Sequence, residues 1–322
     1  MKKTILTGAS GFIGANLAEK LVNNGHEVHL FLRSGYQTWR IKHLLPYIQI
    51  HTVNLLDQES LTAIIKSIRP NWIFHLATFG AYSWQDNSIE AINTNYLSTV
   101  NLIEASMKAG FESFINTGSS SEYGEKDHAP KEDEYLEPNS YYATTKAAAT
   151  LFCRYTAQRT QNPIFTLRLY SVYGHYEDPN RLIPALITKG FKGKLPPLVH
   201  PEVARDFIFS EDICSAYLFV ASSAGRLPAG SVYNVGTGVQ TSIREIVSIT
   251  REIFSISEEP TWGTMENRSW DTNIWVANNA KLCHAGWSPA YDFRTGYLRT
   301  IEWFNQNRLK LAHIYEPGSV HT

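Results

Sequence analysis

Three residues near the middle of the chain have the types and spacing needed to move a proton. Tyr142 and Lys146 lie four positions apart in YYATTKAAA, a segment expected to be helical, so their side chains share one face. A phenol has a pKa of about 10, and an adjacent ammonium lowers that pKa by favouring the phenolate. Ser119 ends an earlier apolar run and can donate to the same substrate oxygen that Tyr142 protonates or deprotonates. The three residues predict acid–base catalysis on a substrate oxygen.

A glycine-rich segment near the N-terminus supplies a second signal. TGASGFIG places Gly8, Gly11 and Gly14 three apart, directly after an apolar strand at Thr4–Leu6 and before a helix. Glycines let the backbone approach a pyrophosphate closely, and the free N–H groups at the start of the helix attract its charge. Tight turns also use glycine, but the position after the first strand favours a dinucleotide-binding loop.

The end of the second expected strand bears on which dinucleotide binds. The strand in HEVHLFLR is followed by Arg33 and Ser34, with no acid where NAD-binding proteins place one against the ribose hydroxyls. Arg33 can instead pair with an adenosine 2′-phosphate, a charge-assisted contact of about 1.5–3 kcal/mol. The alternative interpretation is a solvated surface arginine. The sequence therefore favours NADP(H), with NAD remaining open.

Strands and helices alternate through the first half of the chain. Strands are expected at 4–6, in HEVHLFLR, at 72–77, in SFINT and in IFTLRLYS, and helices at 15–24, 57–65, 88–109 and 140–159. This order predicts an α/β protein with a Rossmann doubly wound parallel sheet. Beyond Tyr173, prolines divide the chain into short pieces, which predicts a smaller, irregular C-terminal substrate domain. The expected domains are 1–172, with a return to the sheet at about 206–236, and 173–322.

Composition excludes several classes of protein. The 322 residues carry a formal net charge of −1, which gives no basic surface for a nucleic acid. Three scattered cysteines, Cys153, Cys214 and Cys283, predict reduced thiols and neither a disulfide framework nor a metal site. The apolar run at the N-terminus is too short for a signal peptide, and no membrane span is expected. We therefore expect a soluble cytoplasmic protein.

These residues together resemble the extended short-chain dehydrogenase/reductase family of nucleotide-sugar epimerases, dehydratases and reductases. The resemblance runs from Lys2 to about Asn307 and rests on motifs in a shared order. TGASGFIG resembles the family's glycine loop, HLA at 75–77 its strand end beside the nicotinamide, and Asn95 its structural helix asparagine. LRLYSVYG resembles R-x-x-N-V-Y-G, with Ser171 in place of Asn. ARDFIF and NRSWDTNIWVANNAKLCHAGWSP resemble two diphosphate-binding segments.

The resemblance assigns roles to further residues. It implies a nucleotide-diphosphate sugar as partner, held by Arg205 and Arg268, because guanidinium forks match phosphate oxygens in pairs. Without the resemblance, both arginines would be interpreted as surface ion pairs. Substrate contacts are also expected at Ser120, Ser121 and Arg181. Further cofactor contacts are expected at Ser10, Phe12, Ile13, Ser34, Leu55, Leu76 and Ala77, beside Tyr142 and Lys146. The family also implies a homodimer through the helices at 88–109 and 140–159.

The segment SSSEYG discriminates between the reactions of this family. Dehydratases resemble T-D-E or T-S-E, with a carboxylate two positions after the Ser/Thr, but here that position is Ser121 and Glu122 comes one later. On an extended segment that shift turns Glu122 to the opposite face, away from an elimination role. The Cys and His of the 3,5-epimerase/reductases are also replaced, by Ser121 and Arg181.

With dehydration and 3,5-epimerisation disfavoured, the reactions that remain need only the transfer of a hydride and one proton. The first hypothesis is an NADPH-dependent 4-ketoreductase of a nucleotide-linked 4-keto-6-deoxy sugar, and the second is a nucleotide-sugar 4-epimerase with bound NAD. Reduction of a small carbonyl compound would leave Arg205 and Arg268 without a use. A non-catalytic dinucleotide sensor would not need Ser119, Tyr142 and Lys146.

The Arg33 interpretation predicts a cofactor-specific effect. Arg33→Asp removes the cation that would face a 2′-phosphate and replaces it with a repelling carboxylate. We expect a fluorescence titration to show that the substitution weakens NADPH binding much more than NADH binding. Equal weakening of the two cofactors would contradict the assignment, as would a wild type that prefers NADH.

Overall fold

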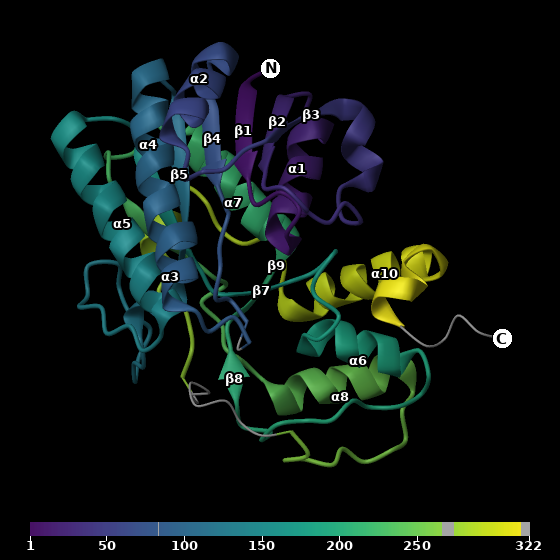
Figure 1. The fold of residues 1–322 in the computed structure, drawn as a ribbon. Coiled ribbons are helices and arrows are strands. Elements are labelled where there is room, and N and C mark those ends of the chain that lie inside the picture. The colour runs from purple at the N-terminus through teal and green to yellow at the C-terminus, as the bar shows by residue number, and fades with distance from the viewer. Residues whose placement is uncertain (83, 266–273, 317–322) are drawn as a thin grey trace.

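A seven-stranded parallel sheet forms the centre of the protein (Figure 1). The structure is a computed structural model that describes residues 1–82, 84–265 and 274–316. The strand order is β10-β6-β5-β4-β1-β2-β3, and all the neighbouring pairs are parallel. The bounds are β1 Lys3–Thr7, β2 Glu27–Leu32, β3 Ile48–Thr52, β4 Trp72–His75, β5 Ser113–Ser119, β6 Ile164–Leu169 and β10 Val232–Val235. The predicted Rossmann doubly wound sheet is confirmed.

Helices cover both faces of this sheet, which explains why its strands are apolar along their length. The pair α1 and α7 packs on one face, and the group α2, α4 and α5 packs on the other. Successive strand residues serve opposite faces: Ile5 of β1 enters the cluster under α2, α4 and α5, whereas Leu6 enters the cluster under α1 and α7. The helices are α1 Phe12–Asn23, α2 Gln58–Ile68, α4 Ser98–Ala109, α5 Tyr141–Thr160 and α7 Ser210–Ser222.

A smaller domain lies below the carboxyl edge of the sheet in the view of Figure 1. Its helices, α6 Leu182–Gly190, α8 Ile243–Phe254 and α10 Phe293–Tyr315, pack around an apolar cluster of their own. Two short ribbons accompany them: β7 Ser171–Tyr173 with β9 Phe207–Phe209, and β8 Ala204–Arg205 with β11 Thr241–Ser242. Two further short helices are η1 Lys42–Tyr47 and α9 Ala280–His284. Within the ranges given above, no helix is long and apolar enough to span a lipid bilayer.

Three elements differ from the sequence-based expectations. The strand at Ile48–Thr52 was not predicted, because its residues are only partly buried and give little apolar signal. In the expected return to the sheet, Val232–Val235 joins β6, but Phe207–Phe209 pairs with β7 outside the main sheet. The single helix expected at 88–109 is α3 Ser88–Ala91, a π-helical turn η2 Ile92–Leu97, and α4.

The π-helical turn carries Asn95, and such turns are frequent at functional sites. The buried Asn95 amide accepts from Phe79 N (2.8 Å) and donates to Phe79 O (2.8 Å) and Thr145 Oγ1 (2.9 Å). These bonds tie the chain after β4 to the start of α5. Asn95 therefore has a structural role, as the resemblance implied.

Candidate active site

The carboxyl ends of the parallel strands meet at the sheet edge that faces the smaller domain (Figure 1). The glycine loop follows β1, Arg33 follows β2, and Leu76 and Ala77 follow β4, while Ser119 ends β5. Ligands of doubly wound sheets bind in the crevice outside this edge. The fold thus brings to one place groups that the sequence spreads over about a third of the chain.

Ser119, Tyr142 and Lys146 lie together beside the start of α5. Lys146 Nζ lies 6.0 Å from the centre of the Tyr142 ring. Burial raises the pKa of Tyr142, and the neighbouring Ser119 hydroxyl and the Arg181 guanidinium offset part of that rise. Tyr142 is therefore a neutral phenol near pH 7, which suits a proton donor.

Lys146 is buried, and its ammonium donates to the Thr117 carbonyl oxygen (2.9 Å). Burial lowers the pKa of Lys146 to about 8, although the Glu122 carboxylate partly opposes the shift. The expectation that this ammonium lowers the pKa of Tyr142 is wrong for this geometry, because burial of the phenol dominates and Arg181 is the cation that acts on it. Lys146 remains a cation at pH 7 and loses its charge just above that pH.

Glu122 is fully buried and faces away from the substrate side of Ser119. One carboxylate oxygen accepts from Ser119 N (2.8 Å) and Thr150 Oγ1 (3.0 Å), and the other accepts from Arg168 Nε (2.8 Å). The sequence argument assumed an extended segment, but Ser120–Tyr123 forms a 3-10 turn, η3, capped by Ser119 and Glu122. The inward orientation of Glu122 therefore has a different cause: the carboxylate is the partner of a buried arginine.

A hydrogen-bond chain fixes Leu76 and Ala77, the expected wall of the cofactor site. Thr7 Oγ1 accepts from both backbone N–H groups (3.1 Å each), so its own proton goes to His75 Nδ1 (2.8 Å). His75 then carries its proton on Nε2 and donates it to Thr99 Oγ1 (3.0 Å). Burial and the Lys146 charge lower the pKa of His75 to about 3, so this chain stays neutral.

The glycine loop fits the pyrophosphate of a dinucleotide. Gly8 has a φ of +70°, and a Cβ there would meet Leu76 C at 2.6 Å, so only glycine allows β1 and β4 this approach. At the start of α1, the N–H groups of Phe12, Ile13 and Gly14 have no hydrogen-bond partner in the part of the chain that the structure describes. Such free donors at a helix start form an anion-binding site.

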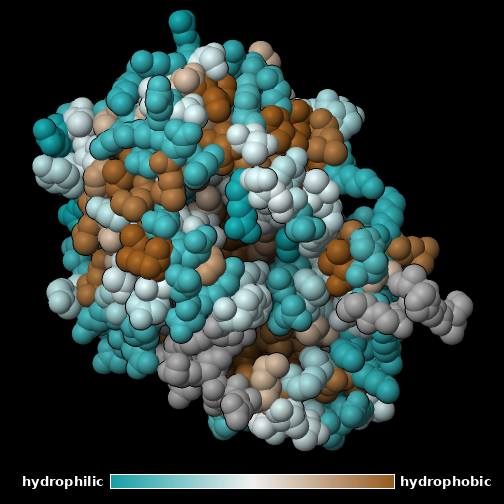
Figure 2. All heavy atoms as spheres, in the orientation of Figure 1, coloured by the Kyte–Doolittle hydropathy of each residue, from teal (hydrophilic) through white to brown (hydrophobic). Residues whose placement is uncertain are grey.

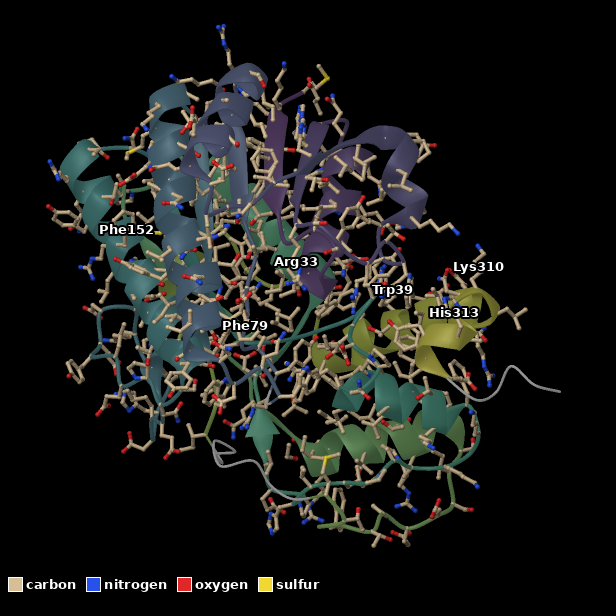
Figure 3. The ribbon with its side chains drawn as sticks, in the orientation of Figure 1. Arg33, Trp39, Phe79, Phe152, Lys310 and His313 are labelled. Atoms are coloured by element: carbon tan, nitrogen blue, oxygen red, sulfur yellow. The ribbon has the colours of Figure 1, made fainter. Side chains whose placement is uncertain are left out.

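The predicted nucleotide-selecting residues lie at the edge of this loop. Arg33 and Ser34 are exposed directly after β2 (Figure 3 labels Arg33), and within the described ranges Arg33 has no ion-pair partner. Leu55, after β3, is partly buried, and Asn101 Nδ2 donates to its carbonyl oxygen (3.1 Å). All the predicted cofactor residues thus follow strands at the carboxyl edge or lie on α5 beside it.

Arg181 lies on the other side of Tyr142, at the start of α6. Its Nη2 donates to Ala81 O (2.9 Å), and its guanidinium lies 4.8 Å from the centre of the Tyr82 ring. Because Arg181 also lowers the pKa of Tyr142, it lies within electrostatic reach of the proton donor. This position is compatible with the predicted substrate contact.

A second arginine reaches the site through Trp275. The Arg205 guanidinium lies 5.2 Å from the centre of the Trp275 ring, and the indole Nε1 donates to Ser120 Oγ (3.1 Å). Ser120 is buried next to Ser119, whereas Ser121 is partly exposed. The predicted Arg268 lies outside the described residues.

Sequence reasoning missed Tyr82 and Trp275. Tyr82 lies in no motif, and Trp275 lies within the segment NRSWDTNIWVANNAKLCHAGWSP, where no role was assigned to it. Each contacts an arginine far along the chain, which a local pattern does not show. No cluster of His, Cys, Asp and Glu in the described ranges could hold a metal ion.

The buried ion pair predicts that Glu122 contributes to stability and not to chemistry. Glu122→Gln leaves the Arg168 guanidinium buried without its carboxylate, which costs about 3–5 kcal/mol. We expect the free energy of unfolding of the variant, measured by urea denaturation, to be lower than that of the wild type by this amount. Glu122→Leu combined with Arg168→Met should lose less stability than the two single variants summed, because it leaves no unpaired charge.

Arg244→Gln is the matched control, because its ion pair with Glu202 is exposed. It should change the unfolding free energy by less than about 1 kcal/mol. A Glu122→Gln protein of unchanged stability that has lost all turnover would instead assign Glu122 to the chemistry.

Comparison with known proteins identifies the family. The model described as NAD dependent epimerase/dehydratase family matches residues 4–236. The trifunctional UDP-glucose 4,6-dehydratase/UDP-4-keto-6-deoxy-D-glucose 3,5-epimerase/UDP-4-keto-L-rhamnose-reductase RHM1 of Arabidopsis thaliana is 26% identical over 95% of this chain and 47% of its own length. The chain thus spans about half the length of the Arabidopsis relatives it matches.

Two further matches align with this chain over almost the full length of both proteins. UDP-glucose 4-epimerase of Mycolicibacterium smegmatis is 27% identical over 94% of this chain and 98% of its own. The solved structure of MoeE5 in complex with UDP-glucuronic acid and NAD has 29% identity and a TM-score of 0.82, over 95% of this chain and 99% of that one. The chain is therefore an enzyme of the NAD dependent epimerase/dehydratase family.

Proposed function

We propose that the protein reduces the C4 carbonyl of a nucleotide-linked 4-keto-6-deoxy sugar, with NADPH as the preferred cofactor. The orientation of Glu122 carries the proposal. Its carboxylate is occupied by Arg168, Thr150 and the Ser119 backbone, so the carboxylate nearest in sequence to Ser119 is withdrawn from the substrate side. The two residues that follow Ser119 are serines, which cannot remove a carbon-bound proton at neutral pH.

The residues of the site then divide the work of a ketone reduction. When bound, the cofactor supplies the hydride. Tyr142 donates its phenolic proton to the C4 oxygen, and Ser119 donates a hydrogen bond to the same oxygen and polarises the carbonyl. Lys146 holds the nicotinamide ribose, and the Arg181 guanidinium, which lowers the pKa of Tyr142, stabilises the phenolate after proton transfer.

The two parts of the chain have separate roles in this proposal. Residues 1–172, with the segment at about 206–236, bind the cofactor, and residues 173–322 bind the nucleotide sugar. Arg205 and Arg268 bind the diphosphate, and Arg181 contacts the sugar beside Tyr142. The support for Arg181 is its electrostatic reach to the Tyr142 hydroxyl.

A nucleotide-sugar 4-epimerase is the second candidate. It uses the same three residues with a retained NAD, and two comparisons favour it: the similarity to UDP-glucose 4-epimerase and the NAD in the MoeE5 complex. The absence of an acid after β2 and the exposed Arg33 favour the reductase, because NADPH is the cofactor used for net reduction.

The two candidates are separated by incubation with NADPH and a panel of nucleotide sugars and nucleotide 4-keto-6-deoxy sugars. NADPH oxidation in step with product formation supports the reductase, and epimer interconversion without net oxidation contradicts it. Tyr142→Phe should abolish turnover and leave cofactor binding nearly unchanged. Since Lys146 has a pKa of about 8, kcat/KM should fall as the pH rises through that value and its charge is lost.

We also propose that the enzyme is a homodimer through α3, η2, α4 and α5. Figure 2 shows apolar surface over this part of the protein, and its exposed apolar side chains, on α3, η2 and α5, are Ile89, Ile92, Leu97, Tyr141, Leu151 and Tyr155. A second copy of the same face would bury them. We expect a dimer mass in analytical ultracentrifugation, and a monomer for Leu151→Glu combined with Tyr155→Glu. A monomeric wild type at micromolar concentration would contradict the proposal.

A further inference from the structure

An arginine outside every motif lies directly against the glycine loop. Arg40 belongs to the connection between β2 and η1, and its Nε donates to Tyr176 O (2.8 Å) while its Nη1 lies 3.4 Å from Ser10 O. Its guanidinium also lies 4.1 Å from the centre of the Trp39 ring. The side chain is thus held in one position between the glycine loop and the segment that follows β7.

The charge of Arg40 is not neutralised by a carboxylate. Within the described ranges no Asp or Glu forms an ion pair with it, and its hydrogen bonds go to two backbone carbonyls. Burial lowers the pKa of the guanidinium, and the attraction of Asp178 and of two tyrosines does not offset this. By contrast, Arg168 has Glu122 as a buried partner. A partly desolvated, unpaired guanidinium is stabilised when an anion binds to it.

The position of Arg40 indicates which anion. In dinucleotide-binding folds, the position about 20 residues after the glycine loop faces the 2′ oxygen of the adenosine ribose. Arg33 occupies that position at the end of β2, and the connection that follows it returns Arg40 to Ser10 of the glycine loop. Arg33 therefore lies at the strand end that faces this oxygen, and Arg40 lies against Ser10 of the adjoining glycine loop.

Contacts with the smaller domain hold Arg40 in place before any ligand binds. Trp39, on which the guanidinium stacks, contacts Tyr315 of α10 edge-on, with ring centres 6.0 Å apart, and lies 6.4 Å from Tyr176. Figure 3 shows Trp39 beside α10. Tyr315 in turn donates to Glu177 O (2.7 Å). Because the aromatic contacts restrict the guanidinium, less conformational entropy is lost when a phosphate binds.

We propose that Arg40 and Arg33 together bind the 2′-phosphate of the adenosine ribose, and that Arg40 is the member of the pair held in place by its contacts while Arg33 is the exposed one. This inference rests on the NADPH preference in the proposed function and names a second residue for it. It requires no particular sugar substrate.

The test uses the full chain and two adenosine ligands that differ only in the 2′-phosphate. Binding of 2′,5′-ADP and of 5′-AMP is measured by calorimetry for the wild type, Arg40→Gln and Arg40→Lys. We expect both variants to bind 2′,5′-ADP about tenfold or more weakly than the wild type, because the pair of charge-assisted hydrogen bonds from the guanidinium to the phosphate is lost. The affinity for 5′-AMP should change less than about twofold. Unchanged 5′-AMP affinity also shows that the glycine loop is intact.

Arg244→Gln is the control, since Arg244 lies on α8 in an exposed ion pair with Glu202, and the substitution should leave both affinities unchanged. Equal weakening of the two ligands would overturn the proposal, because Arg40 would then only shape the glycine loop. Unchanged affinities with a lower melting temperature would also overturn it and leave Arg40 as a bridge between carbonyls. If 2′,5′-ADP discrimination depends on Arg40 but no 4-keto sugar is reduced, the proposed reaction fails and this inference stands.

Discussion

The buried ion pair between Glu122 and Arg168 is the interaction on which the active site depends. It joins the turn after β5 to β6, and Thr150 adds α5 to the same carboxylate. The other end of the network reaches β10, since Arg168 also donates to the Tyr123 hydroxyl (2.8 Å), which donates to Asn234 (2.8 Å). Because Glu122 accepts from the Ser119 backbone N–H, this pair also fixes the position of Ser119. A buried carboxylate needs such a set of donors, and the cost of losing one explains why this residue is unavailable for chemistry.

This arrangement relates the stability of the protein to its reaction class. Gly118 is part of the constraint, because a Cβ there would meet Glu122 Oε1 at 2.6 Å. The carboxylate can therefore reach Arg168 only past a residue without a side chain. The same loop carries Ser119, Ser120 and Ser121, whose hydroxyls can donate hydrogen bonds but cannot act as strong bases. Burial raises the pKa of Tyr142, so this phenol is protonated at neutral pH.

The boundary between the two domains is the second constraint. The carboxyl edge of the sheet supplies the glycine loop and Arg33, whereas α6, the segment after β7 and α10 supply Arg181 and the contacts of Arg40. The residues that we propose for the cofactor and substrate sites thus come from both domains. A change in α10 can reach the cofactor site through Tyr315 and Trp39 without touching the glycine loop.

The sequence alone determined the α/β class, the parallel sheet and the family, because glycine spacing, apolar periodicity and the Tyr142–Lys146 spacing are local properties of the chain. It also located the serines where dehydratases carry acids. It could not determine what Glu122 pairs with, that burial controls the pKa of Tyr142, or that Asn95 lies in a π-helical turn. The tertiary structure decided these points, together with the positions of Arg40, Tyr82 and Trp275. The physical reason is common to all of them: burial and pairing depend on residues far apart in the chain, which only the folded protein brings into contact.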